Sequence, residues 1–167
     1  MQLKSLHNFF KNGLIGYYPK EEIDAFFYRI CDMHLNLKRI DIALKSEMIV
    51  AAQTFEYFEM VIERLLNYEP IQYILGSTFF FGSDFIVDKQ VLIPRPETEE
   101  LISWILEQVD TKHPIKILDV GTGSGCIAIS LAKQLTHAEV YAMDISLGAL
   151  SIAKQNAEAN GVVVQFI

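Results

Sequence analysis

The sequence predicts an α/β protein in three parts: an N-terminal helical bundle over residues 1–70, a β-hairpin connector over 71–93 and the first part of a parallel-sheet domain over 94–167. Three observations lead to this prediction. Apolar residues recur at helical spacing up to about residue 68, short aromatic runs follow Pro70, and strand and helix patterns alternate after residue 94.

The first part contains three amphipathic segments. Their apolar residues recur every three or four positions, as expected of helices that bury one face. Pro19 suits the first position of the second helix, because its missing N–H would be unpaired there in any case. The stripes predict a bundle with an aromatic core: Leu6, Phe9, Phe10 and Leu14; Ile23, Phe26, Phe27 and Ile30; Phe55, Phe58, Ile62, Leu65 and Leu66.

The connector is predicted from short apolar runs interrupted by glycine. Gly76 and Gly82 separate runs rich in aromatic and branched residues, a pattern typical of paired strands. A hairpin needs a surface to pack on, so this segment is expected to join the bundle to the following domain. The residues expected in its strands are Tyr73, Ile74, Phe79, Phe81, Phe85 and Val87.

The third part begins with a helix whose N-terminal residues are Pro96 and several glutamates, which suit the positive end of the helix dipole. Its predicted buried stripe is Leu101, Ile105 and Val109. A strand at 115–121, expected to be buried on both faces, then alternates with helices and further strands. Such alternation predicts right-handed crossovers and a parallel sheet.

Composition indicates a folded protein, with 51% hydrophobic and 21% charged residues. The net charge of −7 argues against nucleic acid as a direct substrate, because phosphate-binding proteins usually carry basic patches. No apolar run approaches the roughly 20 residues that span a bilayer, and the N-terminus has no secretory signal pattern. We therefore expect a cytoplasmic protein that does not enter membranes, and a monomer.

Neither cysteines nor histidines predict a metal site or a disulfide framework. Cys31 and Cys126 are far apart and are expected to be small buried hydrophobes. The histidines form no pair with metal-ligand spacing and are expected on the surface or in loops: His7, His34, His113 and His137.

A glycine-rich loop lies where the first strand of the sheet turns into its first helix. It contains Asp119, Gly121, Thr122, Gly123, Ser124 and Gly125. Ligands of open parallel sheets bind outside the carboxyl ends of the strands, where glycines let the backbone approach a nucleotide-type ligand. A structural turn without a ligand is the alternative. The dinucleotide pattern G-x-G-x-x-G is met poorly, because Cys126 stands at its third glycine.

Asp144 ends the second strand of the sheet. A carboxylate there can accept two hydrogen bonds from ribose hydroxyls, or it can cap the next helix. Its combination with the glycine loop favours the ribose role. The pattern G-x-G-x-G preceded by Asp119 resembles the first motif of class I, Rossmann-like S-adenosylmethionine-dependent methyltransferases, in which the acidic residue and loop hold the amino-acid end of the cofactor.

A closer resemblance follows from EPIQYILG, FFG, DFIVD, VLIPRPETEEL and ILDVGTGSGCIAISLA. Over residues 69–160 these runs resemble the release-factor glutamine methyltransferases of the HemK/PrmC family. The resemblance implies transfer of a methyl group from S-adenosylmethionine to the glutamine side-chain amide of a Gly-Gly-Gln motif in peptide-chain release factors. It further implies that the helical part docks this protein substrate and that the connector joins the two domains.

In the family an Asn-Pro-Pro-Tyr motif contacts the substrate amide, and this sequence does not contain it. We therefore expect the chain to be the cofactor-binding part of a longer enzyme, without catalytic residues of its own and inactive alone. Two alternatives remain: methylation of a nucleic-acid base amine or another protein amide, and a cofactor-binding or interaction fragment without catalysis.

The segment Arg95, Pro96, Glu97 and Thr98 resembles a family segment near the mouth of the active site. A direct role toward substrate or cofactor is one interpretation. The other is that Pro96 and Glu97 only start a helix.

Overall fold

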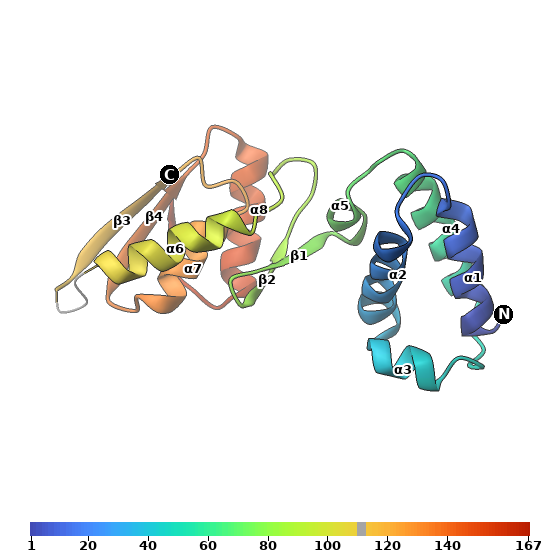
Figure 1. The fold of residues 1–167 in the computed structure, drawn as a ribbon. Helices are drawn as coiled ribbons and strands as arrows, with labels where there is room; N and C mark the ends of the chain where they lie inside the picture. The colour runs from blue at the N-terminus through green and yellow to red at the C-terminus, as the bar shows by residue number, and fades with distance from the viewer. Residues whose placement is uncertain (110–112) are drawn as a thin grey trace. The chain divides into compact units, whose positions relative to one another are not determined.

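The computed structural model describes residues 1–109 and 113–167, which form two compact units, Met1–Leu75 and Gly76–Ile167. The first unit is helical (Figure 1). In the described part of the chain, no helix has the length and apolar character needed to cross a membrane. The helices of the first unit are α1 (Leu3–Leu14), α2 (Lys20–Leu35), α3 (Arg39–Leu44), α4 (Ala52–Leu66) and α5 (Ile71–Leu75).

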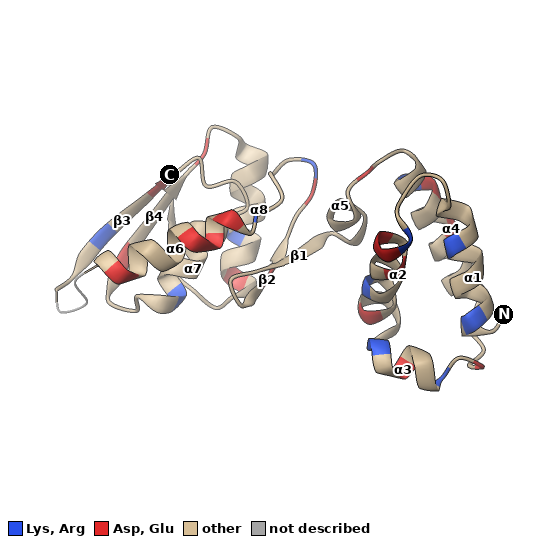
Figure 2. Cartoon of the chain, in the orientation of Figure 1, with Lys and Arg blue, Asp and Glu red and all other residues tan. Residues whose placement is uncertain are grey.

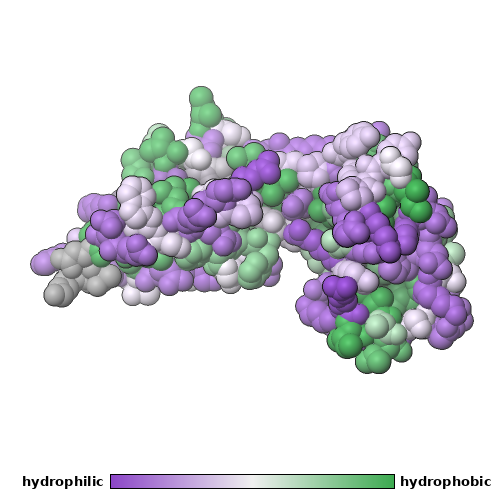
Figure 3. Space-filling view, viewed as in Figure 1, coloured by the Kyte–Doolittle hydropathy of each residue, from purple (hydrophilic) through white to green (hydrophobic). Residues whose placement is uncertain are grey.

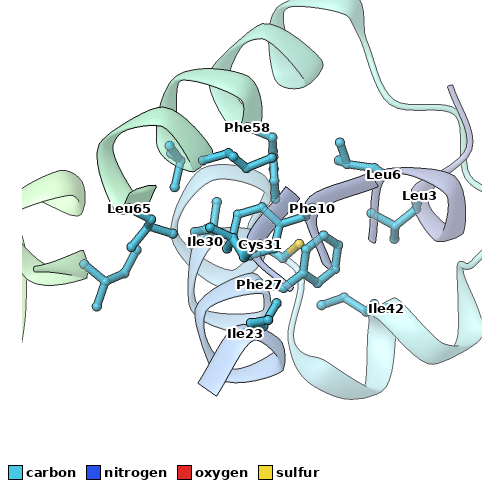
Figure 4. Close-up of a cluster of buried hydrophobic side chains, with 14 of the residues drawn as sticks. Leu3, Leu6, Phe10, Ile23, Phe27, Ile30, Cys31, Ile42, Phe58 and Leu65 are labelled. Atoms are coloured by element: carbon cyan, nitrogen blue, oxygen red, sulfur yellow. The ribbon is translucent and has the colours of Figure 1, made fainter. Parts of the chain in front are cut away.

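The core of the first unit is built around three phenylalanines, as the apolar stripes predicted (Figure 4). The rings of Phe10, Phe27 and Phe58 are fully buried, and their centroids lie 5.4 to 5.8 Å apart. Such tilted and edge-on pairs add to the stabilisation that the buried area provides. Cys31 is also fully buried in this core, which confirms its expected role as a small hydrophobe.

The segment after Pro70 begins with a helix, so the predicted strand at Tyr73 and Ile74 is wrong. Both of their N–H groups donate to the Pro70 carbonyl, at 3.0 and 3.2 Å. Ile71 and Ile74, three residues apart, are both buried with the core of the first unit. A helical turn is more stable here than a strand, because it buries both isoleucines on one face.

The hairpin of the second unit comprises β1 (Ser77–Phe80) and β2 (Ser83–Ile86), paired antiparallel. Phe81 was expected in a strand, but it lies in the two-residue turn. Phe81 and Gly82 have φ values of 44° and 76°. Positive φ at both positions matches the right-handed twist of the flanking strands.

The sheet of the second unit has the order β3-β4-β5, and both pairs are parallel, as predicted. The helices and strands after the hairpin are α6 (Glu97–Gln108), β3 (Ile115–Val120), α7 (Cys126–Gln134), β4 (Ala138–Met143), α8 (Leu147–Ala159) and β5 (Gln165–Phe166).

The expectation that β3 is buried on both faces is wrong. Ile115 and Ile117 pack into the hydrophobic cluster of the second unit, which includes residues of α6 and α7. Leu118 and Val120 point the other way and are 54% and 70% exposed. The strand is apolar on both faces, but among the described residues helices cover only one of them.

The predicted stripe of α6 is also wrong at one position. Ile102 is fully buried, whereas Leu101 is 40% exposed. Ile105 and Val109 pack against the hydrophobic cluster as predicted. Ile102 and Ile105, three residues apart, lie on one face of α6, whereas Val109 follows the helix as its C-cap residue. Several acidic residues lie along α6 (Figure 2).

Candidate cofactor site

The glycine loop is tied to the carboxyl ends of two strands. It leaves β3, and the N–H groups of Gly121 and Thr122 both donate to the Met143 carbonyl at the end of β4, at 2.9 and 3.0 Å. The Gly125 N–H donates to the Thr122 carbonyl at 2.9 Å, which closes the turn before α7. The loop therefore lies at the edge where ligands of parallel sheets bind.

Two of the three glycines of the loop leave open space beside the backbone. All three have positive φ: 78° at Gly121, 56° at Gly123 and 81° at Gly125. A Cβ added to Gly121 or Gly123 would meet no atom within 4 Å. These two positions leave open space above bare backbone, a cradle that side chains would fill and that a ligand can approach closely.

Asp144 joins the glycine loop to the start of α8. Its Oδ2 accepts from the Gly123 N–H and its Oδ1 from the Ser146 N–H, both at 2.9 Å. Two backbone hydrogen bonds, the stronger effect coming from Ser146 and the next from Gly123, hold the pKa of Asp144 below its usual range. The group is an ionised carboxylate at neutral pH, and each oxygen keeps a second acceptor position.

The N-cap of α8 is Ser146, whose Oγ accepts from the Ala149 N–H at 3.2 Å. The alternative role of Asp144 as the helix cap is therefore filled by another residue. Asp144 binds the loop instead, which brings it together with the predicted residues Gly121, Thr122 and Gly123.

Asp119, at the end of β3, accepts a hydrogen bond from the Thr122 hydroxyl at 2.7 Å. The side chains of Thr122 and Ser124 are buried, with 5% and 2% exposure. A ligand can therefore reach little of either residue, because the Thr122 N–H and carbonyl and the Ser124 carbonyl are also bonded within the protein. Asp119 is partly exposed and stays within reach of a ligand in the cradle.

Exposed apolar side chains lie in the connection that follows Asp144, and no sequence pattern above predicted them. Ile145 and Leu147, on either side of Ser146, are 103% and 83% exposed. Figure 3 shows hydrophobic surface over this connection between β4 and α8. The sequence could have indicated this exposed apolar surface, because Ile145 directly follows Asp144 at a strand end, where the chain normally becomes polar.

Arg95, Pro96, Glu97 and Thr98 lie at the start of α6. Pro96 is the N-cap, and the Thr98 N–H donates to the Arg95 carbonyl at 3.0 Å. Arg95, Pro96 and Glu97 are exposed. The hydrogen bonds described for this segment stay within the helix start, so its role at the active-site mouth remains a prediction.

Both units match protein families by sequence. Residues 16–76 match the family model described as the PrmC N-terminal domain, and residues 96–167 match that of ribosomal protein L11 methyltransferase (PrmA). Among solved structures, the Pyrococcus abyssi tRNA (uracil-54, C5)-methyltransferase in complex with S-adenosyl-L-homocysteine aligns with 55% of this chain and 22% of that chain, with 25% identity and a TM-score of 0.46.

Curated relatives match nearly the whole chain. The release factor glutamine methyltransferase of Flavobacterium psychrophilum is 44% identical over 170 residues, covering 100% of this chain and 60% of that protein. That of Bacteroides thetaiotaomicron is 44% identical over 158 residues, covering 95% of this chain and 56% of the relative. The chain thus spans 56 to 60% of the length of these relatives. By sequence, the chain thus matches part of the release factor glutamine methyltransferases of the HemK/PrmC family.

Proposed function

We propose that the chain binds S-adenosylmethionine at the loop Gly121–Gly125 and serves methylation of the glutamine amide in the Gly-Gly-Gln motif of peptide-chain release factors. The observation that carries this proposal is the convergence of the open glycine cradle and the Asp144 carboxylate, joined by the Gly123–Asp144 hydrogen bond of 2.9 Å. The names of the relatives support the substrate.

The residues of the site suit the three parts of this cofactor. The bare backbone at Gly121 and Gly123, with the Asp119 carboxylate beside it, suits the amino-acid end, which carries both an ammonium and a carboxylate. Asp144 can accept from the ribose hydroxyls on its free acceptor positions. The exposed side chain of Ile145 offers an apolar surface for the adenine ring.

The cofactor, when bound, supplies an electrophilic methyl group. The amide nitrogen would take up this methyl group and release a proton to solvent, and the demethylated cofactor would leave. An amide nitrogen is a poor nucleophile, so the reaction depends on positioning. The residues described here position the donor. The printed sequence contains no Asn-Pro-Pro-Tyr segment, so no contact to the substrate amide is assigned to it.

The helical unit is assigned to the protein substrate. Its residues 16–76 match the PrmC N-terminal domain, which supports docking of the release factor by residues 1–70, with 71–93 as the connector to the methyltransferase part 94–167. We expect the protein in the cytoplasm, where release factors act, and as a monomer.

The cofactor is tested by calorimetric titration of S-adenosylmethionine, with NAD as the competing class of ligand. Asp144→Asn is expected to weaken binding about 10- to 100-fold, because charge-assisted hydrogen bonds are lost. Glu139→Gln is the matched control, since Glu139 is an exposed acidic residue paired with Lys116 in the same sheet. Binding of NAD but not of S-adenosylmethionine would overturn the proposal.

The substrate is tested in the intact protein with cofactor carrying a labelled methyl group. Label is expected in a release factor with Gly-Gly-Gln and not in a variant with Gly-Gly-Ala. Transfer to DNA or RNA in place of the release factor would support the base-amine alternative and would contradict the proposed substrate.

A further inference from the structure

One buried side chain connects the hairpin to the glycine loop. Asn156 of α8 is fully buried, and its amide makes three hydrogen bonds. Its Nδ2 donates to the carbonyls of Ile86 and Ser124, both at 2.9 Å, and its Oδ1 accepts from the Ile86 N–H at 2.6 Å. One amide group therefore binds the end of β2 and the glycine loop at the same time.

The bond to Ser124 holds a peptide that determines the end of the loop. The carbonyl of Ser124 points to Asn156, while the N–H of the same peptide, at Gly125, donates to the Thr122 carbonyl. Both polar groups of the peptide are thus fixed, immediately after Gly123 and immediately before α7. Without Asn156 this buried carbonyl would lose its partner, and the peptide could rotate.

The segment from α8 to its C-cap contacts the hairpin and the chain that follows it at two further places. Asn160, one turn after Asn156, donates to the Asp84 carbonyl at 3.1 Å. A Cβ added to Gly148 would collide with Oε1 of Gln90, so the chain leaving the hairpin packs against the first turn of α8. Of these contacts, only that of Asn156 includes the glycine loop.

We propose that Asn156 is a positioning residue for cofactor binding, which couples the conformation of the hairpin to that of the glycine loop. Its amide keeps the Ser124–Gly125 peptide in the orientation that leaves the cradle at Gly123 open. The role in cofactor binding rests on the proposed function. The coupling itself rests on the three hydrogen bonds.

The variant Asn156→Leu removes these bonds at similar side-chain volume. Asn160→Leu, at the C-cap of the same helix, is the control, because it removes bonds to the hairpin, to Lys133 and to the Asn156 carbonyl but none to the loop. Titration with S-adenosylmethionine is done at a temperature where each variant is almost fully folded. A loss of stability alone then leaves the measured affinity unchanged, because affinity scales with the folded fraction.

We expect Asn156→Leu to weaken cofactor affinity at least about tenfold, and Asn160→Leu less than about twofold. If Asn156→Leu does not fold, Asn156→Asp replaces it. This variant keeps the acceptor for the Ile86 N–H but places a carboxylate oxygen against the Ser124 carbonyl. Equal effects of the substitutions at 156 and 160 would overturn the role in cofactor binding.

Amide hydrogen exchange without cofactor tests the coupling independently. The Gly125 amide is expected to exchange at least about tenfold faster in either variant at 156, and the Ile86 amide in Asn156→Leu, whereas Gly125 is unchanged in Asn160→Leu. Unchanged exchange at Gly125 in both variants would overturn the coupling. If the unsubstituted protein does not bind S-adenosylmethionine, the proposed function fails, and the exchange rates still decide whether Asn156 holds the loop.

Discussion

Gly125, before α7, faces Ala153 of α8 so closely that a Cβ added to the glycine would lie 3.1 Å from the Cβ of Ala153. The same atom would lie 2.8 Å from Cδ1 of Ile129. Gly125 therefore differs from the glycines of the open cradle. It lets two helices approach each other beneath the loop, while Gly121 and Gly123 leave space above it.

Gly125→Ala is expected to lower the free energy of unfolding by about 2 to 4 kcal/mol, because positive φ and helix contact both oppose a methyl group. Gly161→Ala is the control. Gly161 has a φ of 66° but open space around its Cβ position, so its substitution by alanine is expected to lower the free energy of unfolding by only about 1 kcal/mol. Denaturant unfolding measures both values, and equal costs would contradict the packing argument.

The stability contributed by Asp144 is expected to depend on pH. Backbone hydrogen bonds from Ser146 and Gly123 lower the pKa of Asp144 in the folded protein. A lowered pKa contributes stability that is present above the unfolded-state pKa and lost as pH falls through the folded-state pKa. The stability difference between the unsubstituted protein and Asp144→Asn should be constant near neutral pH and shrink below about pH 4. Unfolding measured from pH 7 to pH 3 checks this, and a constant difference would contradict it.

Arg64 is expected to stabilise the junction between α4 and α5. Its guanidinium donates to both carboxylate oxygens of Glu69, at 2.7 and 2.8 Å, and to the carbonyls of Tyr73 and Ile74 at 3.4 Å. Glu69 is only 14% exposed, so Arg64→Met should cost about 1 to 2 kcal/mol.

Lys38→Met provides the comparison for Arg64, because the Lys38–Asp32 pair is 68% and 42% exposed. Exposed pairs contribute less than about 1 kcal/mol. Thermal unfolding of Arg64→Met and Lys38→Met compares how much stability each ion pair contributes. An Arg64 variant as stable as the Lys38 variant would show that the partly buried Glu69 carboxylate needs no ion-pair partner.

Both cysteines are expected to resist thiol reagents in the folded protein. Burial raises the pKa of Cys31 to about 12 and that of Cys126 to about 11. At pH 8 the thiolate fraction of Cys126 is then about one part in a thousand, and the thiolate is the reactive form. Labelling with a disulfide reagent should be slow in buffer and fast in denaturant. Fast labelling in buffer would show that the helices open to solvent.

The residues of the cofactor site were predictable because they lie at or just after the ends of strands that the sequence pattern indicates. The glycines lie directly after β3 and Asp144 directly after β4, and parallel strands bring their carboxyl ends to one edge. The hydrogen bond from Gly123 to Asp144 joins two residues that the sequence had already marked. Asn156 was not predictable, because a single asparagine in an amphipathic helix gives no sign of which backbone groups it meets.

The sequence by itself determined the local elements and the parallel connection, because helix and strand periodicity and the turn residues act between neighbours in the chain. Tertiary structure alone decided that Ile102 rather than Leu101 is buried, that Leu118 and Val120 face outward, and that residues 71–75 form a helix. Burial depends on which distant segment covers a side chain. Residues far apart in sequence, such as Ile86 and Asn156, meet only when the whole unit packs.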